Sequence, residues 1–288
     1  MTRLGKLWDL LKKAAKRWGE DNSSRKAAAL AFYAILSLAP LLLFATVIGG
    51  QFLNSNDLRL ALVREARTQL GAGAADLVRG MIESARRPAA GAVATLISIC
   101  LALFGASNLF DQLNLSVSAI WHVTPKRGHA LRNYVASKLF SVLLTLGLVI
   151  VMIGWLALDS VLGFLGRETG QGFLETKLLS FIASMVVLTA LFAVTLRSLP
   201  RGKVKWKDVW LAAALTALGI SISKYLLGVY FSVSSVGSAY GPAGALVIVL
   251  LWFYYSAQIY FFGVEMTFVY AYEYGSHKAE EPGELERS

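Results

Sequence analysis

Residues Gly244 to Tyr272 read GALVIVLLWFYYSAQIYFFGVEMTFVYAY, an apolar stretch that contains a single charged residue, Glu265. A helix rises ~1.5 Å per residue and needs roughly 20 apolar residues to cross the ~30 Å hydrocarbon core of a bilayer. This stretch exceeds that length. We therefore predict that it forms a membrane-spanning helix.

Five further apolar stretches precede it, at residues 27–50, 89–110, 139–158, 178–196 and 209–231. Of the 288 residues, 56% are hydrophobic and 16% are charged, and a soluble domain of this size carries more charge. The sequence therefore predicts an all-α fold, a polytopic membrane bundle of six transmembrane helices. We expect one membrane domain at residues 27–272. A basic cytoplasmic segment at 1–26 precedes it, and a disordered cytoplasmic tail at 273–288 follows it.

The basic residues favour one orientation of this bundle. Segments 1–26, 111–133, 197–208 and 273–288 together hold 18 lysines and arginines, whereas the gaps on the other side hold 8. Because loops rich in lysine and arginine stay on the cytoplasmic side, both termini are predicted to be cytoplasmic. This topology accounts for the net charge of +10, so we predict no nucleic-acid partner.

Peripheral helices are predicted on both sides of the membrane. Near the N-terminus, apolar side chains recur at helical spacing among basic ones, which is typical of an amphipathic helix on an anionic inner leaflet. These apolar residues are Leu4, Leu7, Trp8, Leu11, Ala15 and Trp18. Between spans one and two, helical patterns on either side of Gly71 and Gly73 predict two short outer helices. Those two helices are either a lid over the bundle or a collar of arginines that faces lipid headgroups.

Two charged residues, Lys224 and Glu265, lie inside predicted spans, where a charge costs at least ~2.5 kcal/mol. Helix geometry places Lys224 in the outer half and Glu265 near the inner edge, roughly 20 Å apart, so we do not expect them to pair. Lys224 is expected to extend toward the outer headgroups or to face a cavity in the outer leaflet. Glu265 lies at the depth of Lys138 and Asn108. A Glu265–Lys138 clamp between helices is the preferred interpretation, and a proton or substrate site is the alternative.

The remaining polar features indicate structure rather than catalysis. Pro40 in span one predicts a kink, and Ser37 is placed to bond backbone groups that the proline frees. The histidines lie in predicted cytoplasmic segments without metal-ligand spacing or clustered carboxylates. We therefore predict no catalytic residues, no metal site and no cofactor.

Three stretches of the chain resemble one bacterial family. They are AAALAFYAILSLAP (Ala27–Pro40), FGASNLF followed by AIWHV (Phe104–Val123), and GPAGALVIVLLWFYYS leading to GVE (Gly241–Glu265). Together they resemble the YihY/BrkB family, formerly called the ribonuclease BN family, over about residues 20–275. The resemblance implies a six-helix protein of the bacterial inner membrane with cytoplasmic termini. In it, Trp121 matches the end of the second-span motif and Glu265 the acidic position of the last span.

For function, the sequence favours a transporter-class membrane protein that handles a lipid or another amphiphile, with anionic membrane lipids as partners. Lys224, Arg79 and Arg86 are the candidate lipid-binding residues, because the two arginines share a helical face on the predicted outer side. The alternative is a structural or scaffold membrane protein, and a membrane-bound enzyme is the third option. A groove that opens to lipid and is lined by Lys224 or arginines favours transport, whereas a solid bundle favours a scaffold.

Overall fold

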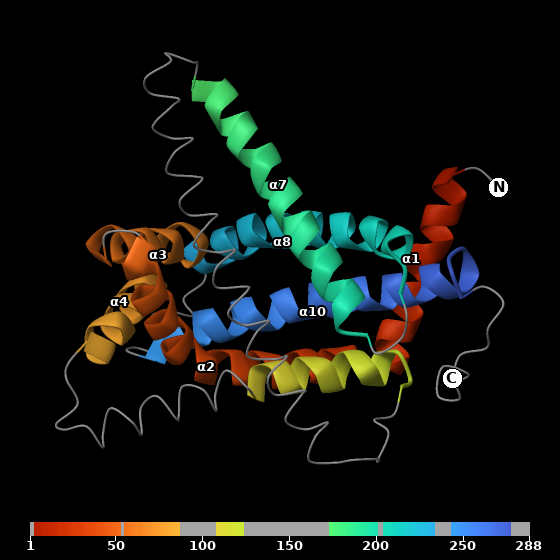
Figure 1. Cartoon of the computed structure of the whole chain (residues 1–288), viewed down its shortest axis with the longest axis horizontal. Helices are drawn as coiled ribbons and strands as arrows, with labels where there is room; N and C mark the ends of the chain where they lie inside the picture. The colour runs from red at the N-terminus through yellow and green to blue at the C-terminus, as the bar shows by residue number, and fades with distance from the viewer. Residues whose placement is uncertain are drawn as a thin grey trace.

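The computed structural model describes residues 3–52, 55–86, 108–123, 173–200, 204–233 and 243–277, and every regular element within them is a helix (Figure 1). The helices are α1 (Arg3–Glu20), α2 (Ser23–Phe52), α3 (Ser55–Leu70), α4 (Ala72–Arg86), α7 (Phe173–Ser198), α8 (Trp206–Val233) and α10 (Gly244–Glu273). A further helical segment covers residues 108–120. The predicted all-α class is confirmed for this described part of the chain.

Among the described helices, three are long and apolar enough to cross a membrane. The candidate spans are Phe181–Ser198 in α7, Trp206–Tyr230 in α8 and Gly244–Glu273 in α10. They overlap the predicted spans at 178–196, 209–231 and 244–272, and α2 contains the predicted first span at 27–50. The predicted span at 139–158 lies outside the described residues, and that at 89–110 is described only from residue 108. The count of six spans therefore stays a prediction.

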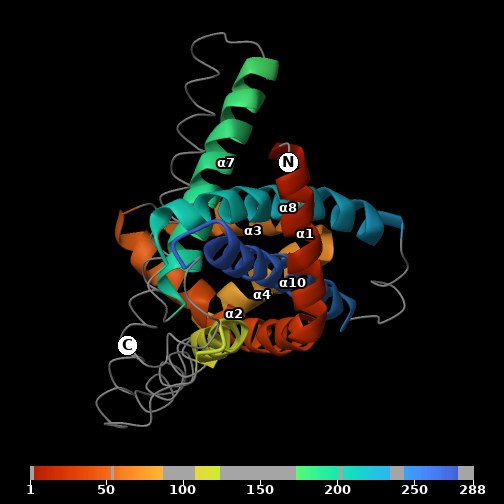
Figure 2. The same ribbon diagram turned by 90° about the vertical axis from the view of Figure 1, so that its right-hand side faces the viewer.

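The long apolar helices lie side by side, and α1 crosses one end of them. α10 lies between α2 and α8, and α7 packs along α8 while leaning away from it toward its own N-terminus (Figure 1). α1 crosses the end of the bundle at which α2 and α8 begin and α10 ends (Figure 2). α1 therefore runs across the direction of the apolar helices (Figure 2).

α3 and α4 pack together at the opposite end of the bundle (Figure 1). Gly71 joins them with a φ of +91°, a backbone conformation that favours glycine. Gly73, near the start of α4, lies beside Ala245 at the start of α10. The small apolar cluster under this pair consists of Leu42, Leu58, Leu62, Val78 and Ile82. The pair thus covers the end of the bundle that is remote from α1.

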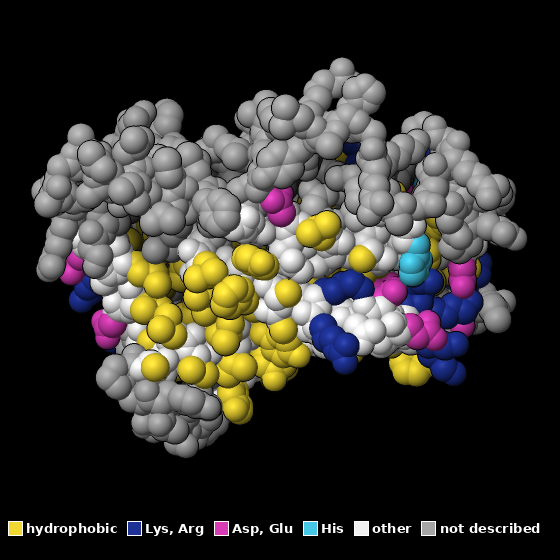
Figure 3. All heavy atoms as spheres, turned by 90° about the horizontal axis from the view of Figure 1, so that it is seen from below, with side chains coloured by type: hydrophobic (Ala, Val, Ile, Leu, Met, Phe, Trp, Pro, Cys, Tyr) yellow, Lys and Arg dark blue, Asp and Glu magenta, His cyan; other side chains and the backbone are white. Residues whose placement is uncertain are grey.

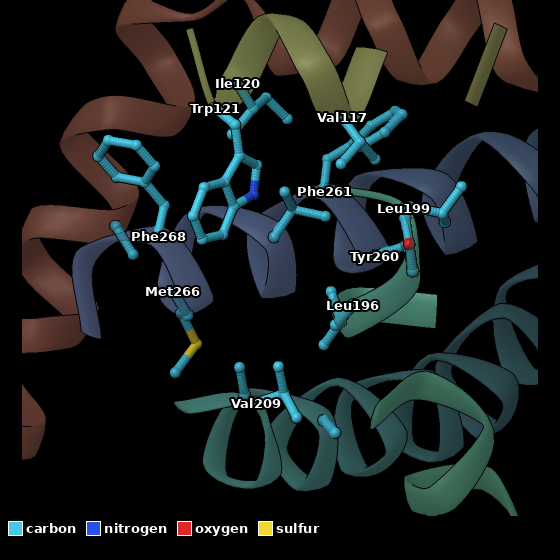
Figure 4. Packing of buried hydrophobic residues seen from close by; sticks show 14 of the residues in the cluster. Val117, Ile120, Trp121, Leu196, Leu199, Val209, Tyr260, Phe261, Met266 and Phe268 are labelled. Carbon is cyan, nitrogen blue, oxygen red and sulfur yellow. The ribbon is translucent and has the colours of Figure 1, made fainter. Parts of the chain in front are cut away.

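The main apolar core lies toward the α1 end and joins segments that are distant in sequence (Figure 4). Trp121, just after the 108–120 helix, is 1% exposed. Its ring meets Phe268 of α10 edge to face, with centroids 5.3 Å apart. Leu196 of α7 and Val209 of α8 belong to the same buried cluster. This core therefore fixes the ends of α7, α8 and α10 relative to one another.

Small residues let α8 and α10 approach closely. A Cβ atom on Gly263 would overlap the Thr216 hydroxyl oxygen, and one on Gly219 would lie 2.9 Å from a methyl carbon of Ile259. Such close approach is a usual basis of helix association in membranes, where water provides no driving force between helices. The two pairs also fix the register of these antiparallel helices.

α1 has a protein-facing side in addition to the apolar stripe predicted for the membrane. Leu10 and Ala14, which are not part of that stripe, are 2% and 0% exposed and pack in the main core. Within the stripe, Leu11 is half-buried, whereas Trp8 is 72% exposed. The helix is therefore docked on α10 along one side, and a neighbouring side carries exposed apolar surface.

Candidate functional site

In the described part of the chain, the carboxylate of Glu265 in α10 is completely buried. Its Oε1 accepts a 3.3 Å hydrogen bond from the Ser23 hydroxyl, and its Oε2 lies 3.4 Å from Arg17 Nε. Ser23 is the first residue of α2 and is also fully buried. A buried charge needs partners of this kind. Glu265 thus ties α1, α2 and α10 together at one point.

Arg17 is the centre of this arrangement. Its Nη2 lies 3.6 Å from Asp21 Oδ2 and 3.0 Å from Nε2 of His122. Its guanidinium carbon lies 4.0 Å from the centre of the Phe268 ring, a cation–π contact. The Arg17 side chain keeps 24% of its surface exposed, whereas Glu265 keeps none. We call this group the Glu265 cluster; it consists of Arg17, Asp21, Ser23, His122, Glu265 and Phe268.

Local backbone geometry brings the members of the cluster together. The chain turns sharply between α1 and α2 within two residues (Figure 2), and Asn22 adopts a left-handed φ of 51°, which asparagine tolerates better than most residues. His122 has the same φ just after the 108–120 helix. On α10, Glu265 and Phe268 are three residues apart and share one face. The cluster therefore depends on two tight turns and one helix face.

A second set of contacts holds α1 against the end of α10. Lys13 Nζ lies 2.7 Å from Glu273 Oε1 and 2.9 Å from Asp9 Oδ2. The hydrogen bond to Glu273, followed by that to Asp9, raises the pKa of Lys13 above its usual range. Lys13 and Arg17 are four residues apart on the same side of α1. Both cations therefore fasten that side to acidic groups of α10.

A second buried carboxylate, Asp208, joins the start of α8 to the end of α10. It is 3% exposed, and its Oδ2 accepts hydrogen bonds from the Ser276 hydroxyl at 2.5 Å and the Ser276 backbone amide at 3.3 Å. A Cβ atom on Gly275 would lie 2.5 Å from Asp208 Oδ1. The chain just after α10 is thus fitted closely around this carboxylate.

A groove of about 570 Å³ lies between α8 and α10 and reaches α1. Ligand sites in proteins commonly enclose ~300–1,000 Å³. Three of its lining residues, Leu218, Ile222 and Tyr255, are 44%, 49% and 43% exposed, so the groove opens to the surroundings. Its lining consists of Leu11, Trp18, Leu215, Thr216, Leu218, Gly219, Ile222, Tyr255, Gln258, Ile259, Phe262 and Met266.

Lys224 lies in α8 at a distance from the Glu265 cluster, and two residues beyond Ile222, a lining residue of the groove. Because Thr216 lies opposite Gly263, Lys224 is about ten residues from the level of Glu265, or about 15 Å along the helix. Its ammonium lies 5.9 Å from the centre of the Tyr225 ring. The groove lining contains neither Lys224 nor an arginine. The structure thus has an open groove, but this groove lacks the lining of Lys224 or arginines that was expected to favour transport.

The other predicted site residues are placed as follows. Arg79 is exposed on α4 and forms no ion pair with any other described residue. Arg86 is the last residue of α4, and its side chain lies outside the described part. Asn108 is partly buried at the start of the 108–120 helix. Lys138 lies outside the described residues, so the Glu265–Lys138 contact stays a prediction.

Ser37 and Pro40 both lie within α2, which continues through the proline to Phe52. Ser37 is fully buried, and its hydroxyl donates to the Ala34 carbonyl at 3.1 Å. The carbonyl crowded by Pro40 is that of Leu36. The serine therefore bonds a different backbone group from the one that the proline frees.

Arg17 and Ser23 were not predicted as partners of Glu265 from the sequence. Arg17 entered only the charge count that sets the topology, and Asp208 was not singled out. A signal was present, because Arg17 and Ser23 immediately precede the first predicted span and so lie at the inner edge, the depth predicted for Glu265. A cation at that depth was needed, and α1 supplies one.

The chemistry available in the Glu265 cluster is that of a structural clamp. The carboxylate bonds a hydroxyl and a guanidinium, and the guanidinium binds a second carboxylate. Within the described residues, no group of three or more His, Cys, Asp or Glu side chains is arranged to hold a metal ion. The ligand-sized feature is the groove.

Comparison with known proteins identifies the relatives of this chain. It is similar to the ribonuclease-like protein YfkH of Bacillus subtilis (strain 168), with 25% identity over 269 residues, 89% of this chain and 93% of that protein. It is similar to a UPF0761 membrane protein of Haemophilus influenzae, with 24% identity over 260 residues, 88% and 91% of the two chains. Another UPF0761 membrane protein, from Psychrobacter sp. (strain PRwf-1), is 24% identical over 257 residues.

The match to the Psychrobacter protein covers 86% of this chain and 46% of that protein, so the chain spans about half the length of that relative. No solved structure matches the chain. The family model described as virulence factor BrkB matches residues 14–286. Since that match covers nearly the whole sequence, the chain belongs to the BrkB family of membrane proteins.

Proposed function

We propose that this membrane protein is of the transporter class and handles a lipid or another amphiphile. The groove between α8 and α10 carries the proposal. It is a cavity of about 570 Å³ with mostly apolar walls, formed by two helices of membrane-spanning length and open at its side. A strongly polar solute would find few partners on such walls, whereas a hydrocarbon chain matches them.

The proposal includes an anionic headgroup site at the other end of the bundle, formed by Lys224 with Arg79 and Arg86. α3 and α4 lie at the end toward which α8 runs, so Lys224 and α4 share that half of the molecule (Figure 1). Arginines bind phosphate in a bidentate manner, and a lysine in a span reaches toward headgroups by extending its side chain. This site shares no residue with the lining of the groove.

The proposed location is the bacterial inner membrane, with both termini in the cytoplasm. The segregation of basic residues supports this orientation. It places α1 and the Glu265 cluster on the cytoplasmic side, and α3 with α4 on the outer side.

One observation favours a scaffold as the second candidate. The Glu265 cluster and the Asp208–Ser276 contact are fully used in joining helices, as expected of a protein whose polar groups serve packing. A scaffold does not need an open apolar groove, however, so we place transport first.

Lipid movement in reconstituted vesicles tests the proposal. Vesicles with phosphatidylglycerol that carries a fluorescent headgroup are treated with dithionite, which bleaches only the outer leaflet. We expect faster loss of the protected fluorescence than in protein-free vesicles, and a slower loss with Lys224→Ala than with the exposed control Lys205→Ala. Bleaching equal to that in vesicles with an unrelated six-helix protein would favour the scaffold.

A further inference from the structure

We propose that the groove binds one acyl chain of an anionic phospholipid from the inner leaflet, with α1 as its roof and Lys12 as a contact for the headgroup. This inference deepens the proposed function, on which it rests for the class of ligand, because it names the leaflet and the two parts of the lipid. It concerns a site distinct from Lys224 and the outer arginines.

The depth of the groove matches the inner leaflet. Its lining residues on α8 run from Leu215 to Ile222, about 9 to 20 Å along the helix from residue 209, where the predicted span begins. The hydrocarbon core is ~30 Å thick, so each leaflet contributes ~15 Å. With α1 at the cytoplasmic surface, the groove begins in the inner leaflet and extends just past the middle of the membrane. That is the region occupied by an inner-leaflet acyl chain.

The lining accepts a hydrocarbon chain but not a charged group. Thr216 contributes an aliphatic hydroxyl to the lining, and Gln258 contributes an amide. The Thr216 hydroxyl already donates to the Ala212 carbonyl at 2.7 Å. The lining contains no lysine, arginine, histidine, aspartate or glutamate. The headgroup of a bound lipid must therefore lie beyond the groove, on the side of α1.

α1 is built as a fixed roof at this mouth. Leu11 and Trp18 of α1 line the groove, and tryptophan is favoured at the depth of the headgroups. The helix cannot move freely, because Lys13 bonds Glu273 and Arg17 bonds Glu265, both on α10. The apolar stripe of α1 is thereby held over the space between α8 and α10.

The roof carries positive charge where a headgroup would lie. Lys12 follows Leu11 directly, is exposed, and forms no ion pair with the described residues. Lys16 is 77% exposed at its side chain and lies 3.7 Å from Glu20. Figure 3, seen from the side of α2 rather than of α8, shows that dark blue Lys and Arg side chains also gather on that face at the α1 end of the molecule. This distribution complements an anionic headgroup joined to an apolar chain.

Photocrosslinking locates the chain directly. The full-length protein is placed in nanodiscs of phosphatidylglycerol with a diazirine at the end of one acyl chain, and the labelled residues are mapped after irradiation. We expect labels to concentrate on groove residues of α8 and α10 near Gly219 and Ile259. Labels no denser there than on the exposed α7 residue Val186 would overturn the proposal.

Matched variants test the two parts of the site by native mass spectrometry. Ile222→Trp fills the groove and should lower retained phosphatidylglycerol at least about tenfold, which corresponds to exclusion of roughly two methylene groups. Val186→Trp, an equally bulky change on exposed α7, should leave it unchanged. Lys12→Gln should lower retention about five-fold for phosphatidylglycerol and not for phosphatidylcholine. The control Lys16→Gln should have less effect, because Lys16 already has an acidic neighbour.

The outcomes separate this inference from the proposed function. Labels in the groove together with unchanged lipid movement in Ile222→Trp would keep the site and contradict transport through it. Lipid movement without labels in the groove would contradict the site and leave transport standing. Equal retention of both lipids by wild type and Lys12→Gln would remove the headgroup contact.

Discussion

At the scale of single residues, Glu265 and Arg17 decide how the α1 end of the bundle is held together. Breaking a buried ion pair by removing one partner is costly, because the other charge stays buried without compensation. Arginine suits the position because its planar group bonds both carboxylates and stacks on Phe268. A lysine would not reproduce this set of contacts.

We predict that Arg17→Met destabilises the protein by roughly 3 kcal/mol, because Glu265 loses its cation. Lys16→Met, one residue away and 77% exposed at its side chain, should change stability by less than about 0.5 kcal/mol. Thermal unfolding of the detergent-solubilised protein gives the comparison. The double variant Arg17→Met/Glu265→Met should lose less than the sum of the two single changes. Additive losses would show that the two side chains are not coupled.

Glycine positions between α8 and α10 provide a second residue-scale prediction. Gly263→Ala should destabilise the protein by about 1–3 kcal/mol, because the new methyl group displaces the Thr216 hydroxyl. Gly228→Ala should be neutral or slightly stabilising, since a Cβ atom there meets nothing within 4 Å and alanine favours helix. The same unfolding assay compares them. Equal effects of the two alanines would contradict the close packing at Gly263.

The partner of Glu265 shows what the sequence leaves open at this scale. Residue spacing and the predicted topology place Glu265 at the inner edge of the membrane, and an ionic partner there is a sound expectation. Several cations lie at that depth, including Lys138 and Arg17. Which one reaches α10 depends on the direction in which α1 crosses the bundle. Hydrophobic periodicity carries no information about that crossing angle.

At the scale of elements, α1 has two apolar sides with different roles. The periodic stripe through Trp8, Leu11 and Trp18 was visible in the sequence because lysines interrupt it regularly. The docked side through Leu10 and Ala14 is short and lies between the stripe and the cations Lys13 and Arg17. It was missed because a single small alanine gives little signal of burial.

Neighbouring alanines of α1 test this assignment. Ala14 is fully buried and Ala15 is exposed. We predict that Ala14→Leu destabilises the protein by about 1–3 kcal/mol through overpacking, whereas Ala15→Leu changes stability by less than about 0.5 kcal/mol. Thermal unfolding of both variants provides the measurement. A larger loss for Ala15→Leu would mean that the predicted stripe, rather than the Leu10 side, packs on α10.

At the scale of the whole molecule, the positions and lengths of the apolar stretches predict the bounds of α7, α8 and α10 closely. This is because membrane thickness sets the length of a spanning helix almost independently of packing. The arrangement of these helices could not be predicted in the same way. The groove runs along the contact between α8 and α10, beside the close approaches at Thr216 and Gly219, and its shape depends on side chains rather than on hydropathy.

Orientation in the membrane is tested with a pair of glycines at opposite ends. Gly19 and Gly80 are both exposed, and a side chain at either meets nothing within 4 Å. After replacement of Cys100, we predict that an impermeant maleimide labels Gly80→Cys in intact cells, and labels Gly19→Cys only after the membrane is permeabilised. The reverse pattern would contradict the cytoplasmic placement of α1.

The most direct test of the account is an electron cryomicroscopy map of the full-length protein in nanodiscs that contain phosphatidylglycerol. The account predicts elongated non-protein density between α8 and α10, passing Gly219 and Ile259 beneath Trp18, with its headgroup end beside Lys12. A groove closed by protein side chains, or one without density while lipids are resolved around α7, would contradict it.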